Sequence, residues 1–287
     1  IFFNEEGGKG MRKVKASRVL LFAAACILTV IYIFPFVLTI FNSMKTSQEF
    51  IMNPFSLPSA FHVENFTQAL QEMKFFSALK NTFILTIVSS LLITLFGATA
   101  AYVISRFSHK KWVSALFLMM VASMVAPFQV YMIPIVKIYG GTFGLNNSLL
   151  FLSVVALGLN LPFSIFLIRG FLNGIPIEIE QAAMIDGCSY IQVFFRIVLP
   201  MLKPIVITLL VFVSMGIWND YLMSSLFLTD EVKRTLALTI RVFVNEYSVD
   251  YAPMLAGLFL SMIPMLIFYV LCQKHILEGV VQGSVKG

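Results

Sequence analysis

The chain has 287 residues, of which 59% are hydrophobic and only 12% are charged, and its mean hydropathy is +0.91. These values lie outside the range of water-soluble domains and predict an integral membrane protein. The net charge of +6 does not indicate nucleic-acid binding, because the basic residues lie at the ends of apolar stretches, where they orient a chain in a bilayer.

Cysteine and histidine residues do not predict a catalytic or metal site. The three cysteines are scattered, and the three histidines lie far apart with no nearby ligand pattern. Neither set supplies a nucleophile with a neighbouring base. The chain also lacks the GxxxxGK[ST] pattern that binds nucleotide phosphates. We therefore expect no catalytic residue, no metal and no ATP hydrolysis by this chain alone.

The first 18 residues are predicted to form a cytoplasmic amino-terminal segment. Residues 1–10 are apolar, then acidic, then glycine-rich, whereas Met11 followed by basic residues is typical of a translation start. Residues 1–10 are therefore excluded from the fold prediction. The apolar stretch that follows is too long for a signal peptide and has no small-residue cleavage site, which predicts a permanent membrane anchor.

Uncharged stretches long enough to cross a bilayer recur along the chain. A charged side chain at the bilayer centre is costly, and a helical span needs about 20 apolar residues. The stretches show no strand-like alternation, so each is predicted to be a helix. We expect an all-α integral membrane protein with six transmembrane helices in a domain that covers residues 19–273. The predicted spans are 19–41, 82–105, 112–136, 148–168, 204–227 and 252–272.

The distribution of basic residues predicts that both ends of the chain are cytoplasmic. Lysine and arginine cluster before the first span, between the second and third spans, and in the carboxyl tail, residues 274–287. Short cytoplasmic loops carry such an excess. An even number of spans agrees with this orientation. The polar loop at 174–200, between the fourth and fifth spans, then also faces the cytosol.

This polar loop, which we call the docking loop, is predicted to contain two short helices. Glu178 and Glu180 add negative charge near the positive end of the first helix. Gly187 can end that helix, and Ser189 with Gln192 has the form of a capping box that starts the second. Side chains three and four residues apart lie on one face of a helix, and here they form a stripe that could enter a groove on a partner. The stripe consists of Ile179, Ala182, Ala183 and Asp186.

A motif in the docking loop matches that of a known protein family. The matching residues are Gln181, Ala182, Ala183, Gly187, Leu199 and Pro200. They resemble the EAA loop of binding-protein-dependent ABC importer permeases, and the pair Asp186-Gly187 resembles the carbohydrate branch. The surrounding string, the pair Trp218-Asn219 and the last residues resemble the maltose-type second permease. The resemblance covers most of residues 11–287.

The resemblance implies a type I ABC importer permease fold in which the docking loop inserts into a cleft of a cytosolic ATPase. In that family the loop transmits closure of the ATPase dimer to the spans. The implied coupling residues are Glu180, Gln181, Ala182, Ala183, Asp186 and Gly187. Gln181 stands where the family motif often has glutamate, and Glu180 keeps a carboxylate one residue earlier. The main ATPase contact could therefore come from either residue.

The carboxyl tail resembles the terminal segment of maltose-type permeases, which reaches between the two ATPase subunits. The ATPase contacts implied by this resemblance are Gln282, Gly283, Ser284 and Lys286. Composition alone would favour a frayed tail without a binding role.

Polar groups inside the spans are candidates for the translocation path, because such groups face the bundle interior or a water-filled cavity in lipid. The candidates are Ser123, Gln129, Ser214, Trp218, Asn219 and Asp220. An aromatic ring can pack on the apolar face of a sugar, and amides can pair with hydroxyl groups. Alternatively, Trp218 anchors its span at the membrane interface and Asp220 lies near the outer surface.

Together these features predict a permease subunit of an ATP-driven, binding-protein-dependent importer in the bacterial plasma (inner) membrane, which moves an oligosaccharide by alternating access. The implied partners are a homologous second permease, two ATPase subunits that bind ATP and Mg, and an external solute-binding protein. The chain itself is expected to bind no cofactor. The alternative is an ion-coupled secondary transporter, but such proteins usually show repeated halves and several mid-span ionisable residues.

Overall fold

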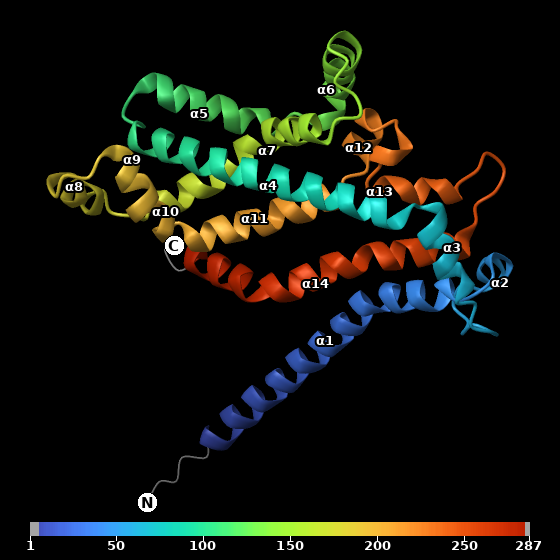
Figure 1. Ribbon diagram of the computed structural model, residues 1–287. Helices are drawn as coiled ribbons and strands as arrows, with labels where there is room; N and C mark the ends of the chain where they lie inside the picture. Colours follow the sequence, from blue (N-terminus) through green and yellow to red (C-terminus); the bar gives the residue numbers. More distant parts are fainter. Residues whose placement is uncertain (1–5, 285–287) are drawn as a thin grey trace, which may run out of the picture. The chain divides into compact units, whose positions relative to one another are not determined.

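The computed structural model describes the backbone of residues 6–284 and the side-chain surroundings of residues 18–273, and this part of the chain is helical. The long helices are α1 (Glu6–Ser43), α4 (Phe75–Arg106), α7 (Leu149–Leu172), α11 (Lys203–Trp218) and α14 (Tyr251–Ser284) (Figure 1). The shorter helices are α2 (Ser47–Met52), α3 (Glu64–Glu72), α5 (Lys111–Ser123), α6 (Phe128–Ile135), α8 (Glu178–Ile185), α9 (Tyr190–Val193), α10 (Leu199–Met201), α12 (Leu222–Phe227) and α13 (Leu236–Thr239). Two π-helices, η1 (Val136–Thr142) and η2 (Phe194–Val198), continue α6 and α9.

The chain divides into two units: unit 1 comprises Ile1–Ala69 and Phe243–Phe259, and unit 2 comprises Leu70–Val242 and Leu260–Gly287. Buried polar groups hold the turn after α1 in unit 1. Lys45 is completely buried and its Nζ donates to the carbonyl oxygen of Asn53 at 3.0 Å. The amide of Asn65 donates to the carbonyl oxygens of Ser43 and Lys45, at 2.8 Å each. These bonds satisfy groups that would otherwise be costly to bury.

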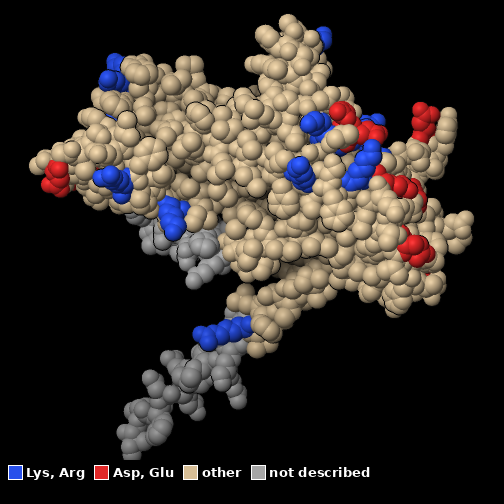
Figure 2. All heavy atoms as spheres, in the orientation of Figure 1, with Lys and Arg blue, Asp and Glu red and all other residues tan. Residues whose placement is uncertain are grey.

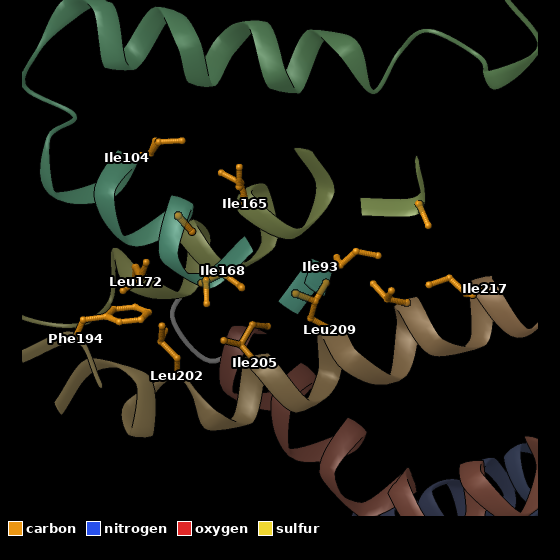
Figure 3. Close-up of a cluster of buried hydrophobic side chains, with 14 of the residues drawn as sticks. Ile93, Ile104, Ile165, Ile168, Leu172, Phe194, Leu202, Ile205, Leu209 and Ile217 are labelled. Atoms are coloured by element: carbon orange, nitrogen blue, oxygen red, sulfur yellow. The ribbon is translucent and has the colours of Figure 1, made fainter. Parts of the chain in front are cut away.

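Unit 2 is built around α4, which packs against α7 and α11. Ile93 of α4, Ile168 of α7 and Leu209 of α11 are fully buried and lie together in the core (Figure 3). Gly97 permits the close approach of α4 to α7, because a Cβ atom at this position would lie 2.4 Å from the Oγ of Ser164. Small residues commonly allow membrane helices to approach in this way.

Four helices within the described residues are long and apolar enough to cross a membrane, and there are up to six spans if each of two bent helix pairs counts as one. The four are Arg18–Ser43, Phe75–Arg106, Leu149–Leu172 and Tyr251–Gln273. The sequence-based prediction of an all-helical protein with several apolar spans is thus confirmed for this part of the chain.

Two of the predicted spans are not continuous helices. In the interval 112–136, α5 ends at Ser123, and the next helical segment begins at Phe128 after a 95° bend. Pro127 lies at this break, where its missing amide donor favours an interruption. In the interval 204–227, α11 ends at Trp218 and a separate helix follows. Each of these two predicted spans is therefore divided between two helical segments.

Candidate functional site: the docking loop and the cavity beside α11

Helix α8 ends at a glycine with the backbone geometry that the sequence suggested. Gly187 has φ of +89°, a left-handed conformation that residues with a Cβ rarely adopt. Its N–H donates to the carbonyl oxygen of Met184 at 3.1 Å, and the N–H of Cys188 donates to that of Ala183 at 3.0 Å. This pair of bonds is a Schellman motif, which satisfies the last carbonyl groups of a helix. Gly187 thus ends α8 and sets the direction of α9.

The second helix of the docking loop begins with the expected capping box. The Ser189 hydroxyl accepts a hydrogen bond from the N–H of Gln192, and the Gln192 side chain accepts one from the N–H of Ser189. The segment then continues through η2 and α10 and meets α11 at a bend of 75°. Pro200 and Pro204 flank this bend, where their missing amide donors favour an interruption of the helix.

Glu180 is attached to the end of α4. Its side chain is only 3% exposed, and one carboxylate oxygen, Oε1, accepts from Nε of Arg106 at 2.8 Å and from Nη2 of the same residue. The other oxygen, Oε2, accepts from the Tyr102 hydroxyl at 2.8 Å. Removing one partner of a buried pair commonly costs about 3–5 kcal/mol, because the other charge stays buried. Glu180 therefore fixes α8 to α4.

The six predicted coupling residues divide between an inner and an outer face. Glu180 and Ala183, three positions apart, are buried, and Ala183 belongs to the apolar core of unit 2. The other four, Gln181, Ala182, Asp186 and Gly187, are exposed. Ile185, Tyr190 and Ile191 are also exposed, Ile185 at 86%. This outer surface is the part of the loop that is free to contact a partner.

Sequence reasoning missed the partners of Glu180. The basic residues between the second and third spans, which include Arg106, were used only to orient the chain, and Tyr102 lies inside the predicted span 82–105. The signal that could have found them is their spacing, because residues four apart on a helix share a face. Tyr102 and Arg106 thereby present a hydroxyl and a guanidinium to one carboxylate.

A cavity of about 190 Å³ lies between α4, α7 and the carboxyl end of α11. Its polar lining includes Asn160 of α7 and Asp220, and Gly216 leaves room on the side of α11. Of the six predicted path residues, Asp220 alone borders this cavity. Asn160 was missed, although the rule that polar groups within spans face the interior applies to it equally.

The other predicted path residues lie elsewhere. Ser214 and Trp218 border a separate, apolar cavity of about 260 Å³ between α4, α11 and α14. Ser214 shares a hydrogen bond of 2.9 Å with the hydroxyl of Ser90, and the indole of Trp218 packs edge-to-face on Phe83. These contacts join helices, and the predicted contact of Ser214 and Trp218 with a sugar stays a prediction. Ser123, Gln129 and Asn219 are exposed and border neither cavity.

Asp220 caps the first turn of α12. Its carboxylate accepts from the N–H of Met223 at 3.3 Å and from the N–H and hydroxyl of Ser224 at 2.9 and 3.1 Å. We expect Asp220→Ala to destabilise the protein by about 1 kcal/mol, as for loss of a helix cap. Asp220→Asn, which keeps an acceptor oxygen, should retain more of this stability. Thermal inactivation of the two purified variants measures the difference, and equal stability would contradict the capping role.

The predicted ATPase-contacting residues of the tail lie outside the residues whose side chains are described. The backbone of α14 continues to Ser284, so Gln282, Gly283 and Ser284 are helical, whereas Lys286 lies beyond the described backbone. Their predicted role stays a prediction.

The described part of the chain thus combines several helices that are apolar enough to cross a membrane with an exposed two-helix loop. The family model of the binding-protein-dependent transport system inner membrane component matches residues 93–276. The chain therefore belongs to this family, and the predicted ABC importer permease is confirmed at that level. Its membership makes it a non-catalytic, multi-pass subunit of a multi-component importer in the bacterial inner membrane.

Similar proteins extend over nearly the whole chain. The "Probable starch degradation products transport system permease protein AmyC" of Thermoanaerobacterium thermosulfurigenes is 36% identical, over 96% of this chain and 100% of that protein. The "Melibiose/raffinose/stachyose import permease protein MelC" of Bacillus subtilis (strain 168) is 30% identical, over 96% of this chain and 99% of that protein. The crystal structure of a bacterial ABC transporter involved in the import of the acidic polysaccharide alginate contains a chain with a similar fold. The TM-score is 0.73 and the sequence identity is 19%, over 96% of this chain and 99% of that chain.

Proposed function

We propose that this chain is the permease subunit of an ATP-driven, binding-protein-dependent importer of oligosaccharides. The observation that carries the coupling role is the exposed face of the docking loop, which is held in place by Glu180 and by the turn at Gly187. The sugar specificity is supported by relatives that are named for starch degradation products and for melibiose, raffinose and stachyose. Selection of the particular sugar would rest mainly with the external binding protein.

The proposed arrangement has six spans with both chain ends in the cytosol. Each bent helix pair would then form one span. Lysine and arginine side chains lie at the start of α5, in η2 and at the start of α11, and acidic side chains lie on α8. The opposite end of unit 2, around α12 and α13, carries both basic and acidic side chains (Figure 2). An excess of basic residues is typical of the cytoplasmic side. The docking loop would therefore face the cytosol.

The outer face of the docking loop would bind a cleft on an ATPase subunit. Ile185 and Ala182 offer apolar and small surfaces for such a cleft, and Gln181 offers an exposed amide. Two ATPase subunits would carry ATP and Mg, and a homologous second permease would complete the membrane pore. Closure of the ATPase dimer would move α8 and favour the outward-open state of the spans, and hydrolysis would restore the inward-open state.

Part of the translocation path would run along the cavity that Asn160 and Asp220 border. An amide and a carboxylate can both accept hydrogen bonds from sugar hydroxyl groups. Because Asp220 also caps α12, its carboxylate is already oriented toward its own backbone. The amide nitrogen of Asn160 donates to the Ala156 carbonyl oxygen one turn earlier, and its amide oxygen would accept from a hydroxyl group of a passing sugar.

The ATPase-binding role is tested by placing a charge on the outer face of the loop. We expect Ala182→Glu to reduce the amount of ATPase subunit that co-purifies with the tagged chain in mild detergent at least about tenfold, the effect of a loss of roughly 1.4 kcal/mol in binding. Mass spectrometry identifies and quantifies the co-purified proteins.

Uptake of radiolabelled maltotriose and raffinose by reconstituted complexes tests the substrate class.

The matched control is Ala60→Glu, the same substitution in an exposed loop residue of unit 1. This variant should retain its ATPase subunits. Unchanged ATPase recovery with Ala182→Glu would refute docking through this face, and a chain that purifies alone under several gentle conditions would refute the importer assembly.

A further inference from the structure

The end of α4 binds the carboxylate of Glu180 through both oxygens. Arg106, the last residue of α4, donates from two nitrogens to Oε1, and Tyr102, one turn earlier, donates to Oε2. The guanidinium of Arg106 also lies 5.9 Å from the centroid of the Tyr102 ring. Two-point attachment to one carboxylate fixes the orientation of α8 as well as its distance from α4.

Other contacts around this carboxylate are apolar and join the same segments. The ring of Tyr102 packs against that of Phe194 in η2, with centroids 5.1 Å apart. Ala183, one turn after Glu180, lies in the core with Leu172 and Phe194. The described contacts thus join both parts of the docking loop to the same end of α4.

Helix α4 continues from this attachment to the far end of unit 2. It packs against α7 and α11 along its length, and Leu85, more than five turns before Arg106, borders the cavity beside Asp220. Helix α4 is continuous over 32 residues and contains no proline, so it has no proline kink that would absorb a displacement. A displacement of α8 would therefore be carried along α4 to the cavity.

We propose that Tyr102, Arg106 and Glu180 form a link that transmits movement of the docking loop to α4, with Glu180 as a positioning residue and not as the contact to the ATPase. This inference rests on the proposed function, because it requires an ATPase that moves α8. It leaves Gln181, which is exposed, as the polar side chain of the matched motif that faces the partner.

The quantity that tests the link is the number of sugar molecules transported per ATP hydrolysed. Complexes of full-length variants with their copurified partners are reconstituted in liposomes, and uptake of radiolabelled maltotriose or raffinose is measured beside ATP hydrolysis. We expect Glu180→Gln and Arg106→Ala to keep the ATPase subunits but to lower this ratio at least about tenfold. Tyr102→Phe, which removes a single hydroxyl contact, should lower the ratio less, and Arg106→Lys should lie between Arg106→Ala and the unchanged protein.

The matched control is Glu231→Gln. Glu231 also pairs with a basic residue near an end of α4, since its Oε2 lies 3.1 Å from Nζ of Lys74, but both side chains are more than half exposed. Exposed pairs contribute little, and Glu231 does not contact the docking loop in the described structure. We expect this variant to keep an unchanged ratio.

The outcomes separate the link from the docking role. Retention of the ATPase by Ala182→Glu would refute docking itself. If Ala182→Glu releases the ATPase while Glu180→Gln and Tyr102→Phe keep a normal ratio, the link alone is refuted. A parallel fall of uptake and hydrolysis, in proportion to the amount of assembled complex, would show that Glu180 and Tyr102 only stabilise the fold and would likewise overturn the proposal.

Discussion

Gly187→Pro is expected to abolish sugar uptake while the chain remains inserted in the membrane. Proline fixes φ near −65°, whereas the turn after α8 requires +89° at this residue. Proline also removes the N–H that donates to the carbonyl oxygen of Met184. Together these effects should cost roughly 3 kcal/mol or more, as proline does inside a helix, where it likewise removes a hydrogen bond and clashes with the backbone. The outer face of the docking loop would then lose its orientation.

Two further substitutions of Gly187 separate the backbone effect from side-chain bulk. No atom lies within 4 Å of the position that a Cβ would occupy, so Gly187→Ala meets only the left-handed backbone cost of about 1–2 kcal/mol. Gly187→Asn should be milder, because asparagine tolerates this region better. Uptake measured beside the membrane content of each variant should decrease in the order Gly, Asn, Ala, Pro. Normal uptake by Gly187→Pro would contradict a coupling role for this turn.

The local chemistry of the docking loop was predictable from the sequence because it depends on short-range rules. Ser189 and Gln192 form a capping box through residues three apart, and Gly187 ends a helix through its own backbone freedom. The apolar stretches likewise predicted helices wherever charge is absent. The break within the third predicted span lies at Pro127, whereas the break after Trp218 has no proline within it to indicate it.

The inner and outer faces of the loop could not be separated from the sequence, because this depends on contacts between distant residues. Glu180 and Gln181 are adjacent and similarly polar, yet one is buried against Arg106, 74 positions away, and the other is exposed. The cavities that the predicted path residues border also depend on contacts between distant elements. Ser214 and Asp220 lie on one predicted span, but Ser214 borders a cavity that α4, α11 and α14 line, whereas Asp220 borders one between α4, α7 and the end of α11.

Gly97→Ala is expected to destabilise the helix bundle of unit 2. The added Cβ would lie 2.4 Å from the Oγ and 2.7 Å from the Cβ of Ser164. Rotation of the serine side chain moves Oγ but cannot move its Cβ, so α4 and α7 would have to separate. Overpacking of this kind costs about 1–3 kcal/mol. The temperature at which the purified complex loses half of its ATP hydrolysis in a fixed time should fall by roughly 2–4 °C for each kcal/mol lost.

The matched control for this prediction is Gly158→Ala in α7, where a Cβ would meet no atom within 4 Å. Alanine favours the helical backbone more than glycine does, so Gly158→Ala should be neutral or slightly stabilising. Adding Ser164→Gly to Gly97→Ala removes the atoms with which the new Cβ collides and should restore part of the lost stability. Equal half-inactivation temperatures for Gly97→Ala and Gly158→Ala would show that α4 and α7 are not in close contact at Gly97.

Because α4 also carries the attachment of Glu180, a separation of these helices should lower the number of sugars transported per ATP even at temperatures where the complex stays assembled.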